Sequence, residues 1–137
     1  MRGIDLSSYQ IGQREIDSLS ACDVQIRFEY FIKRVADWGE IWTLKDEDGY
    51  VLFGDADRQE LVPVWPFREF AVQCCDGIWK NASAVSISTV EFMTKWIPGT
   101  TVDSRKVAVF PTRGGNAATV TAQVLNDALR AALDEIE

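Results

Sequence analysis

The sequence predicts a single compact α+β domain with a mixed or antiparallel sheet of about five strands, flanked by roughly three to four helices. The chain has 137 residues, which is the usual size of one domain. Helical and strand-like patterns both occur along it, and no repeat, low-complexity tract or Pro/Gly/Ser-rich linker divides it. Residues 1–19 are polar and weakly patterned, so we expect an N-terminal arm or short helix there and the α+β domain over 20–137.

The first strong helix is expected from residue 24 to about residue 37. Ser20 and Asp23 precede it and resemble a helix cap with an acid in the first turn. Helical spacing places these apolar residues on one face: Val24, Phe28, Phe31, Ile32 and Val35.

A β-hairpin is expected next. Residues 40–45 and 50–53 have strand character, and the Asp-Glu-Asp-Gly sequence at 46–49 forms the turn between them. Residues 61–64 predict a third strand, in which Pro63 indicates an edge position or an irregularity, because proline cannot donate a ladder hydrogen bond.

A helix is expected to begin at Pro66, because proline is favoured at the first helical position. Its inner stripe would be Phe67, Phe70, Ala71, Cys74 and Ile78. A short strand follows at 84–87, and a capping box at 88–91 (Ser-Thr-Val-Glu) starts a further helix. Pro-Gly at 98–99 is expected to end that helix after about Trp96.

The last third of the chain predicts a strand, a turn and a long helix. The strand at 106–110 is the most apolar and is expected to be the most buried. The turn follows at 111–116, and the helix runs over about 122–136. Its apolar face consists of Leu125, Ala128, Leu129, Ala132, Leu133 and Ile136.

The composition excludes several kinds of active site. The sequence has five tryptophans and no histidine, the commonest general base and metal ligand, so serine–histidine triads, cysteine–histidine dyads and histidine-bearing zinc sites are ruled out. The three cysteines are expected to be buried and reduced, and they do not suffice for a structural zinc site. We therefore predict no catalytic residue, metal or cofactor.

The formal net charge of −7 argues against binding to nucleic acid or to an anionic membrane. No apolar run reaches the ~20 residues that a membrane span needs, and the N-terminus lacks the pattern of a signal peptide. We expect a cytoplasmic protein. An acidic surface suits either solubility or a basic protein partner.

The stretch from Arg27 to the C-terminus contains an ordered series of tryptophan and proline positions. The segments that carry it are 30–38, 41–42, 62–66, 69–71, 91–92, 95–99 and 107–112. This series resembles the bacterial family called domain of unknown function 2750. The resemblance implies one small α+β domain, and it assigns no activity, substrate or catalytic residue.

The tryptophans and the acidic hairpin region are the candidate binding features. All five tryptophans fall at or near junctions between predicted elements, where they either staple elements together or anchor a partner. Trp65 and Trp79 are the two expected to remain partly exposed. The acids form either a solvated turn or a docking rim, and Leu44 at the first ligand position excludes an EF-hand calcium loop.

These features support three hypotheses. The first is a non-enzymatic bacterial protein-binding module of the immunity or accessory type. Its candidate surface is Trp65, Arg68, Glu69, Trp79, Asp46, Glu47, Asp48, Asp55 and Asp57. The second is a small-molecule binder or a histidine-independent enzyme, with Glu69 as the favoured carboxylate. The third is a homodimer whose exposed aromatics face each other.

Overall fold

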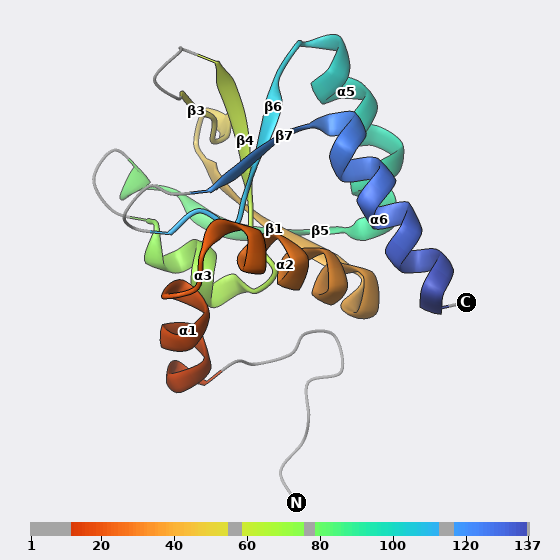
Figure 1. The fold of residues 1–137 in the computed structure, drawn as a ribbon. Helices are drawn as coiled ribbons and strands as arrows, with labels where there is room; N and C mark the ends of the chain where they lie inside the picture. Colours follow the sequence, from red (N-terminus) through yellow and green to blue (C-terminus); the bar gives the residue numbers. More distant parts are fainter. Residues whose placement is uncertain (1–11, 55–58, 76–78, 113–116, 137) are drawn as a thin grey trace, which may run out of the picture.

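The computed structural model, which describes residues 12–54, 59–75, 79–112 and 117–136, contains two β-sheets with helices packed around them (Figure 1). Its class is α+β, as predicted. The strands are β1 (Glu40–Asp46), β2 (Gly49–Tyr50), β3 (Phe53–Gly54), β4 (Glu60–Val64), β5 (Ser83–Ser88), β6 (Lys106–Val109) and β7 (Ala118–Thr121). The helical segments are α1 (Gln13–Ser20), α2 (Val24–Trp38), α3 (Arg68–Gln73), α4 (Thr89–Glu91), the π-helical turn η2 (Phe92–Trp96), α5 (Ile97–Val102) and α6 (Ala122–Ile136).

The β-structure is divided differently from the single sheet of about five strands that the sequence predicts. One sheet has the order β2-β1-β5 and is antiparallel throughout. The other has the order β3-β4-β6-β7, in which β4 and β6 are parallel. The hairpin strand expected at 50–53 is split between the two sheets, since Tyr50 pairs with β1 and Phe53 pairs with β4.

A β-bridge between Trp42 and Trp65 joins the two sheets. Trp65, directly after β4, exchanges backbone hydrogen bonds with Trp42 of β1 at N–O distances of 2.8 and 2.9 Å. Beside this bridge, the hydroxyl of Thr43 donates to the carbonyl of Pro63 at 2.7 Å. The helix expected at Pro66 therefore begins later, at Arg68, because the chain remains extended through Phe67.

Pro63 lies in an interior strand, so the expected edge position is wrong. The carbonyl of Val64 accepts from Phe110 on the β6 side, and alternation along a strand turns the backbone of Pro63 to the other side. On that side β3 pairs only with Glu60 and Leu61. Pro63 is tolerated because no ladder hydrogen bond requires an N–H at its position.

Helix α2 has the predicted bounds and a defined cap at each end. The carboxylate of Asp23 accepts from the N–H of Ile26 at 2.9 Å, which satisfies one donor of the first turn. Gly39 ends the helix in the left-handed region with φ of 76°, where glycine has no Cβ to strain. The chain then turns directly into β1.

Two other helical predictions need correction. Helix α3 ends at Gln73, well before the predicted end, and Ile78 lies outside the described residues. The segment that begins with the confirmed Ser88 cap does not stop at Pro98-Gly99 but continues to Val102. The π-helical turn at 92–96 shifts the hydrogen bonds by one residue, and Pro98 falls in the first turn of α5, where a missing N–H costs nothing.

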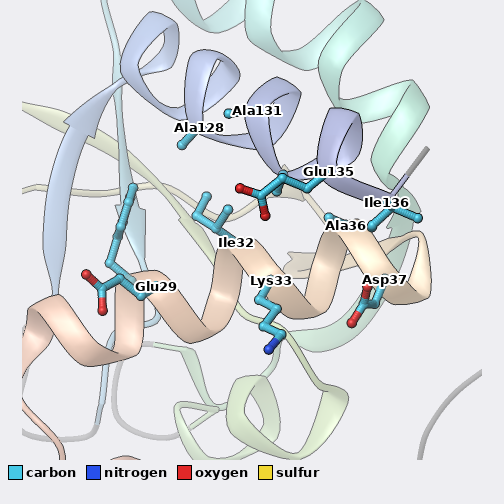
Figure 2. A pocket seen from close by; sticks show the side chains of 11 residues that line it. Glu29, Ile32, Lys33, Ala36, Asp37, Ala128, Ala131, Glu135 and Ile136 are labelled. Carbon is cyan, nitrogen blue, oxygen red and sulfur yellow. The ribbon is translucent and has the colours of Figure 1, made fainter.

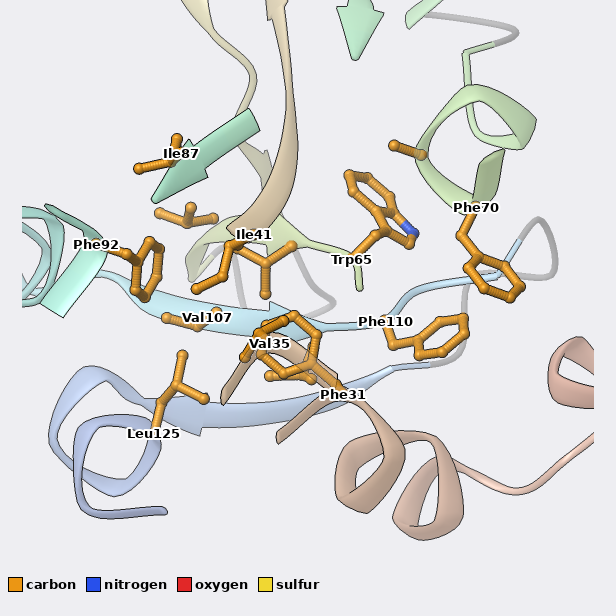
Figure 3. Close-up of a cluster of buried hydrophobic side chains, with 14 of the residues drawn as sticks. Phe31, Val35, Ile41, Trp65, Phe70, Ile87, Phe92, Val107, Phe110 and Leu125 are labelled. Atoms are coloured by element: carbon orange, nitrogen blue, oxygen red, sulfur yellow. The ribbon is translucent and has the colours of Figure 1, made fainter. Parts of the chain in front are cut away.

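The core lies between the sheets and the covering helices (Figure 3). Helices α2 and α6 contact each other and strands β6 and β7, while α3 contacts β1 and β5. Helix α1, which falls in the predicted arm, adds Ile16 to the same core. Side chains with no exposed surface include Phe31, Val35, Ile41, Leu44, Trp65, Phe92, Val107, Phe110, Leu125 and Leu129.

Within the described ranges, none of the helices combines the length and apolar character needed to cross a bilayer. The three cysteines are free thiols, as expected, but only Cys74 is buried, while Cys22 and Cys75 are partly exposed.

Candidate functional site

Trp65 cannot belong to a binding surface, so its predicted exposure is wrong. Its side chain has 0% exposure, and its indole Nε1 donates to the carbonyl of Pro111 at 2.8 Å. The same carbonyl accepts from the thiol of Cys74. Trp65 follows a central strand and bridges the two sheets, so its ring lies among core side chains such as Phe70 (Figure 3).

The other tryptophans divide between packing and exposure. Trp42, Trp79 and Trp96 are partly buried and pack against the core. This agrees with the prediction that tryptophans at the junctions hold neighbouring elements together. Trp38, at the end of α2, is 42% exposed. Trp79 is partly exposed, as expected, and it also packs against the core.

The predicted acidic surface is placed in part by the structure. Asp46, Glu47 and Asp48, called here the acidic turn, meet Asn81 and Ala82 around a shallow hollow of about 320 Å³. The carboxylate of Asp46 accepts from the N–H of Asp48 at 2.9 Å, so one of these acids stabilises the turn itself. Trp79 lies two residues before Asn81, next to the hollow in sequence.

Arg68 and Glu69 lie in the first turn of α3, with Arg68 exposed and Glu69 partly buried. Asp55 and Asp57 lie outside the described residues. The acidic turn and the Asn81 region thus come together through the pairing of β1 with β5. Arg68 and Glu69 line neither that hollow nor the larger one described next.

A larger site, which the sequence did not predict, lies between α2 and α6 (Figure 2). It is an open groove with a volume of about 500 Å³. We call it the α2–α6 groove. Its lining residues are Phe28, Glu29, Ile32, Lys33, Ala36 and Asp37 of α2, and Ala128, Ala131, Ala132, Glu135 and Ile136 of α6.

The groove exists because the facing positions of α6 carry short side chains. Residues 128, 131 and 132 are all alanine and share one helical face. Alanine fills little of the space between two packed helices, so a hollow remains between α2 and α6. Ile32 and Ala36 of α2 lie at its floor and keep 9% and 8% of their surface exposed. At the end of the groove, Ile136 leaves 54% of its surface exposed. The signal in the sequence was a run of alanines where larger residues would have closed the interface.

The rim of the groove is predominantly acidic. Glu29, Asp37 and Glu135 are exposed on it, against the single cation Lys33. In the part of the chain that the structure describes, none of these four groups makes an ion pair. Asp37 and Glu135 also lie near the C-terminal ends of α2 and α6, whose dipoles add partial negative charge at that end.

The groups with displaced pKa values serve the fold and lie outside the groove. Burial lowers the pKa of Arg27, which is 3% exposed and donates to the carbonyls of Cys22 and Phe110 at 2.6 and 3.1 Å. Burial also raises the pKa of Tyr30, although Arg34 partly opposes the rise. Among the described residues, no three histidine, cysteine or acidic side chains gather closely enough to hold a metal ion.

The fold and the α2–α6 groove together define a small α+β protein with an open groove between two helices and acidic residues on its rim. The chain belongs to the family described as "Protein of unknown function (DUF2750)", whose model matches residues 28–129. The match runs from the first groove residue of α2 through all the strands to Leu129 of α6, so it confirms the resemblance. The lining residues from Ala131 onward lie beyond it. No curated protein sequence matches the chain.

Proposed function

We propose that this protein is a non-enzymatic binding module that docks a basic segment of another protein in the α2–α6 groove. The observation that carries the proposal is an open hollow of about 500 Å³ that is lined by apolar side chains and has an acidic rim. Apolar area supplies affinity when a partner covers it, and a rim of one sign selects and orients a partner of the opposite sign. The net charge of −7 acts in the same direction at longer range.

A protein segment suits the groove better than a small molecule does. Small-molecule sites are enclosed and have a few fixed polar groups that converge on the ligand. In this groove the polar groups are the ends of exposed side chains on the rim, and the floor is aliphatic and aromatic carbon. Such a surface recognises a stripe of side chains rather than one compact molecule.

A second copy of the chain is also a poor occupant. A two-fold interface places the same patch of each copy against the other, so the rim acids Glu29, Asp37 and Glu135 would face one another. Like charges brought together across an interface oppose association. A basic partner removes this conflict.

The test is site-specific photo-cross-linking in a lysate of the source cells. A benzophenone amino acid replaces Lys33 on the groove rim, and the control protein carries it at Gln123, an exposed residue of α6 outside the groove. We expect the probe at 33 to capture one partner through one contiguous segment rich in lysine or arginine, identified by mass spectrometry. The probe at 123 should not capture it.

The purified partner then provides the decisive comparison. Ala131→Arg fills the groove and reduces its net negative charge, while Gln123→Arg makes the same change of charge elsewhere on α6. We expect Ala131→Arg to weaken binding by at least about tenfold and Gln123→Arg to leave it nearly unchanged. Equal binding by both variants, or equal cross-linking from both positions, would contradict the proposal. A partner that instead responds only to neutralisation of the acidic turn would move the site to that turn.

A further inference from the structure

The walls of the α2–α6 groove determine what kind of segment fits it. Both walls are α-helices, whose backbone groups are already hydrogen-bonded within each helix. An extended segment would therefore find no strand edge with which to pair, whereas a helix satisfies its own backbone. This inference rests on the function proposed above and names the chemistry of the partner.

The dimensions of the groove match a short helix. Its lining runs from Phe28 to Asp37 on α2 and from Ala128 to Ile136 on α6. At 1.5 Å per residue, each wall is roughly 12–14 Å long, which corresponds to about two and a half helical turns. The alanine side chains of α6 allow another helix to approach closely, as small residues do at helix–helix contacts.

The charges along the groove are ordered. Glu29 lies at one end, Lys33 lies in the middle, and Asp37 lies at the other end (Figure 2). Glu135, near the end of α6, turns its carboxylate back toward Ile32. Helices α2 and α6 run in the same direction along the groove, so both C-termini are also at the Asp37 end. The two helix dipoles add partial negative charge at that end, where the carboxylate of Asp37 also lies.

We infer that the occupant is an amphipathic α-helix that lies antiparallel to α2 and α6, with lysine or arginine in its N-terminal half. The antiparallel direction places the positive end of its dipole, as well as its cations, against Asp37 and the C-terminal ends of α2 and α6. An acidic residue near its middle faces Lys33. Leucine-sized residues spaced by three and four positions enter the space above Ile32, Ala36 and Ala132.

The test uses a displayed library of helical peptides of about 18 residues, a length at which an isolated helix has measurable stability. A leucine stripe is constant, and every other position is lysine, glutamate or glutamine. The library is selected on the intact protein after depletion on Ala131→Arg. We expect enrichment of lysine in the N-terminal half and of glutamate at the middle positions.

A charge exchange in the protein provides the matched control. Lys33→Glu should change the selected middle residue from glutamate to lysine, while the N-terminal preference stays the same. Peptides chosen on the intact protein should bind Ala131→Arg at least about tenfold more weakly and Gln123→Arg equally well. A spin label at the peptide N-terminus should broaden the amide signals of Asp37 and Glu135 rather than those of Phe28 and Glu29.

Three results would overturn the inference. The first is that no peptide is enriched on the intact protein over Ala131→Arg. The second is that a helix-breaking proline at the peptide centre leaves binding intact. The third is that the intact protein is a dimer which Ala131→Arg converts to a monomer, because a second copy would then occupy the groove. If a partner segment still cross-links to position 33 when the peptides fail, the binding function stands and only the helical occupant is wrong.

Discussion

The guanidinium of Arg27 in α2 donates from Nε to the backbone carbonyl of Phe110, 83 positions away in the sequence, at 3.1 Å. It lies 5.9 Å from the centre of the Phe110 ring and also donates from Nη1 to the carbonyl of Cys22. Phe110 has a φ of 60°, an uncommon conformation for a residue with a Cβ. The buried arginine thus holds the strained end of β6 against the start of α2.

Arg27→Met should destabilise the fold strongly. The substitution keeps much of the buried volume but leaves the carbonyls of Phe110 and Cys22 without this donor. We expect the free energy of unfolding to fall by about 2–4 kcal/mol, because hydrogen bonds from a buried charged group are lost. Urea denaturation measures this change. Arg130→Met, at an exposed position of α6, is the control and should stay within about 0.5 kcal/mol. Equal effects of the two substitutions would contradict the anchoring role of Arg27.

Trp65→Ala should act on folding, because Trp65 lies in the core rather than on a binding surface. Truncating a fully buried tryptophan removes its packing and its hydrogen bond to Pro111, so we expect a loss of about 3–5 kcal/mol in unfolding free energy. Trp38→Ala, at the partly exposed end of α2, should cost clearly less. The midpoints of denaturant-induced unfolding of the two variants compare these losses of stability. A smaller loss for Trp65→Ala than for Trp38→Ala would contradict the role of the Trp65 side chain in the core.

Tyr30 should make stability fall at high pH. Burial raises the pKa of its hydroxyl in the folded state, while the unfolded chain keeps the ordinary value. The unfolded state therefore loses this proton first, and stability decreases as the pH rises above about 10 towards the folded pKa. Unfolding free energies of the intact protein and of Tyr30→Phe are measured from about pH 8 to pH 11. The difference between the two proteins should shrink over the upper part of this range. A constant difference would be evidence against the raised pKa.

Two glycine-to-alanine substitutions should change stability in opposite directions. Gly39 has a φ of 76°, so Gly39→Ala should cost about 1–2 kcal/mol through strain alone, since a Cβ there meets no neighbouring atom. Gly99 lies within α5, with open space around a new Cβ and no positive φ. Gly99→Ala should therefore stabilise the protein by about 0.5–1 kcal/mol. Thermal unfolding measures the stability of both variants. A change of melting temperature in the same direction for both would show that the backbone conformation of the two glycines does not determine the effect.

The α+β class and the long helices could be predicted because their signals are local. The apolar residues of α2 and α6 repeat with the helical period, and Asp23 and Ser88 cap helices through bonds to residues three positions away. The continuation past Pro98 was missed, because the π-helical turn before it leaves no simple periodic signal. The short strand β7 was missed because it has only four residues, three of them small or polar.

The candidate site depended almost entirely on long-range contacts. The sequence by itself determined the acidic charge, the absence of histidine chemistry, the family and the helices that form the groove walls. Only the tertiary structure decided that Trp65 bridges two sheets and is buried, and that Ala128 and Ala132 lie beside Ile32 with no side chain filling the space above them. The reason is physical: a helical period shows which face of a helix is apolar, but whether that face is covered depends on the size of side chains about a hundred residues away.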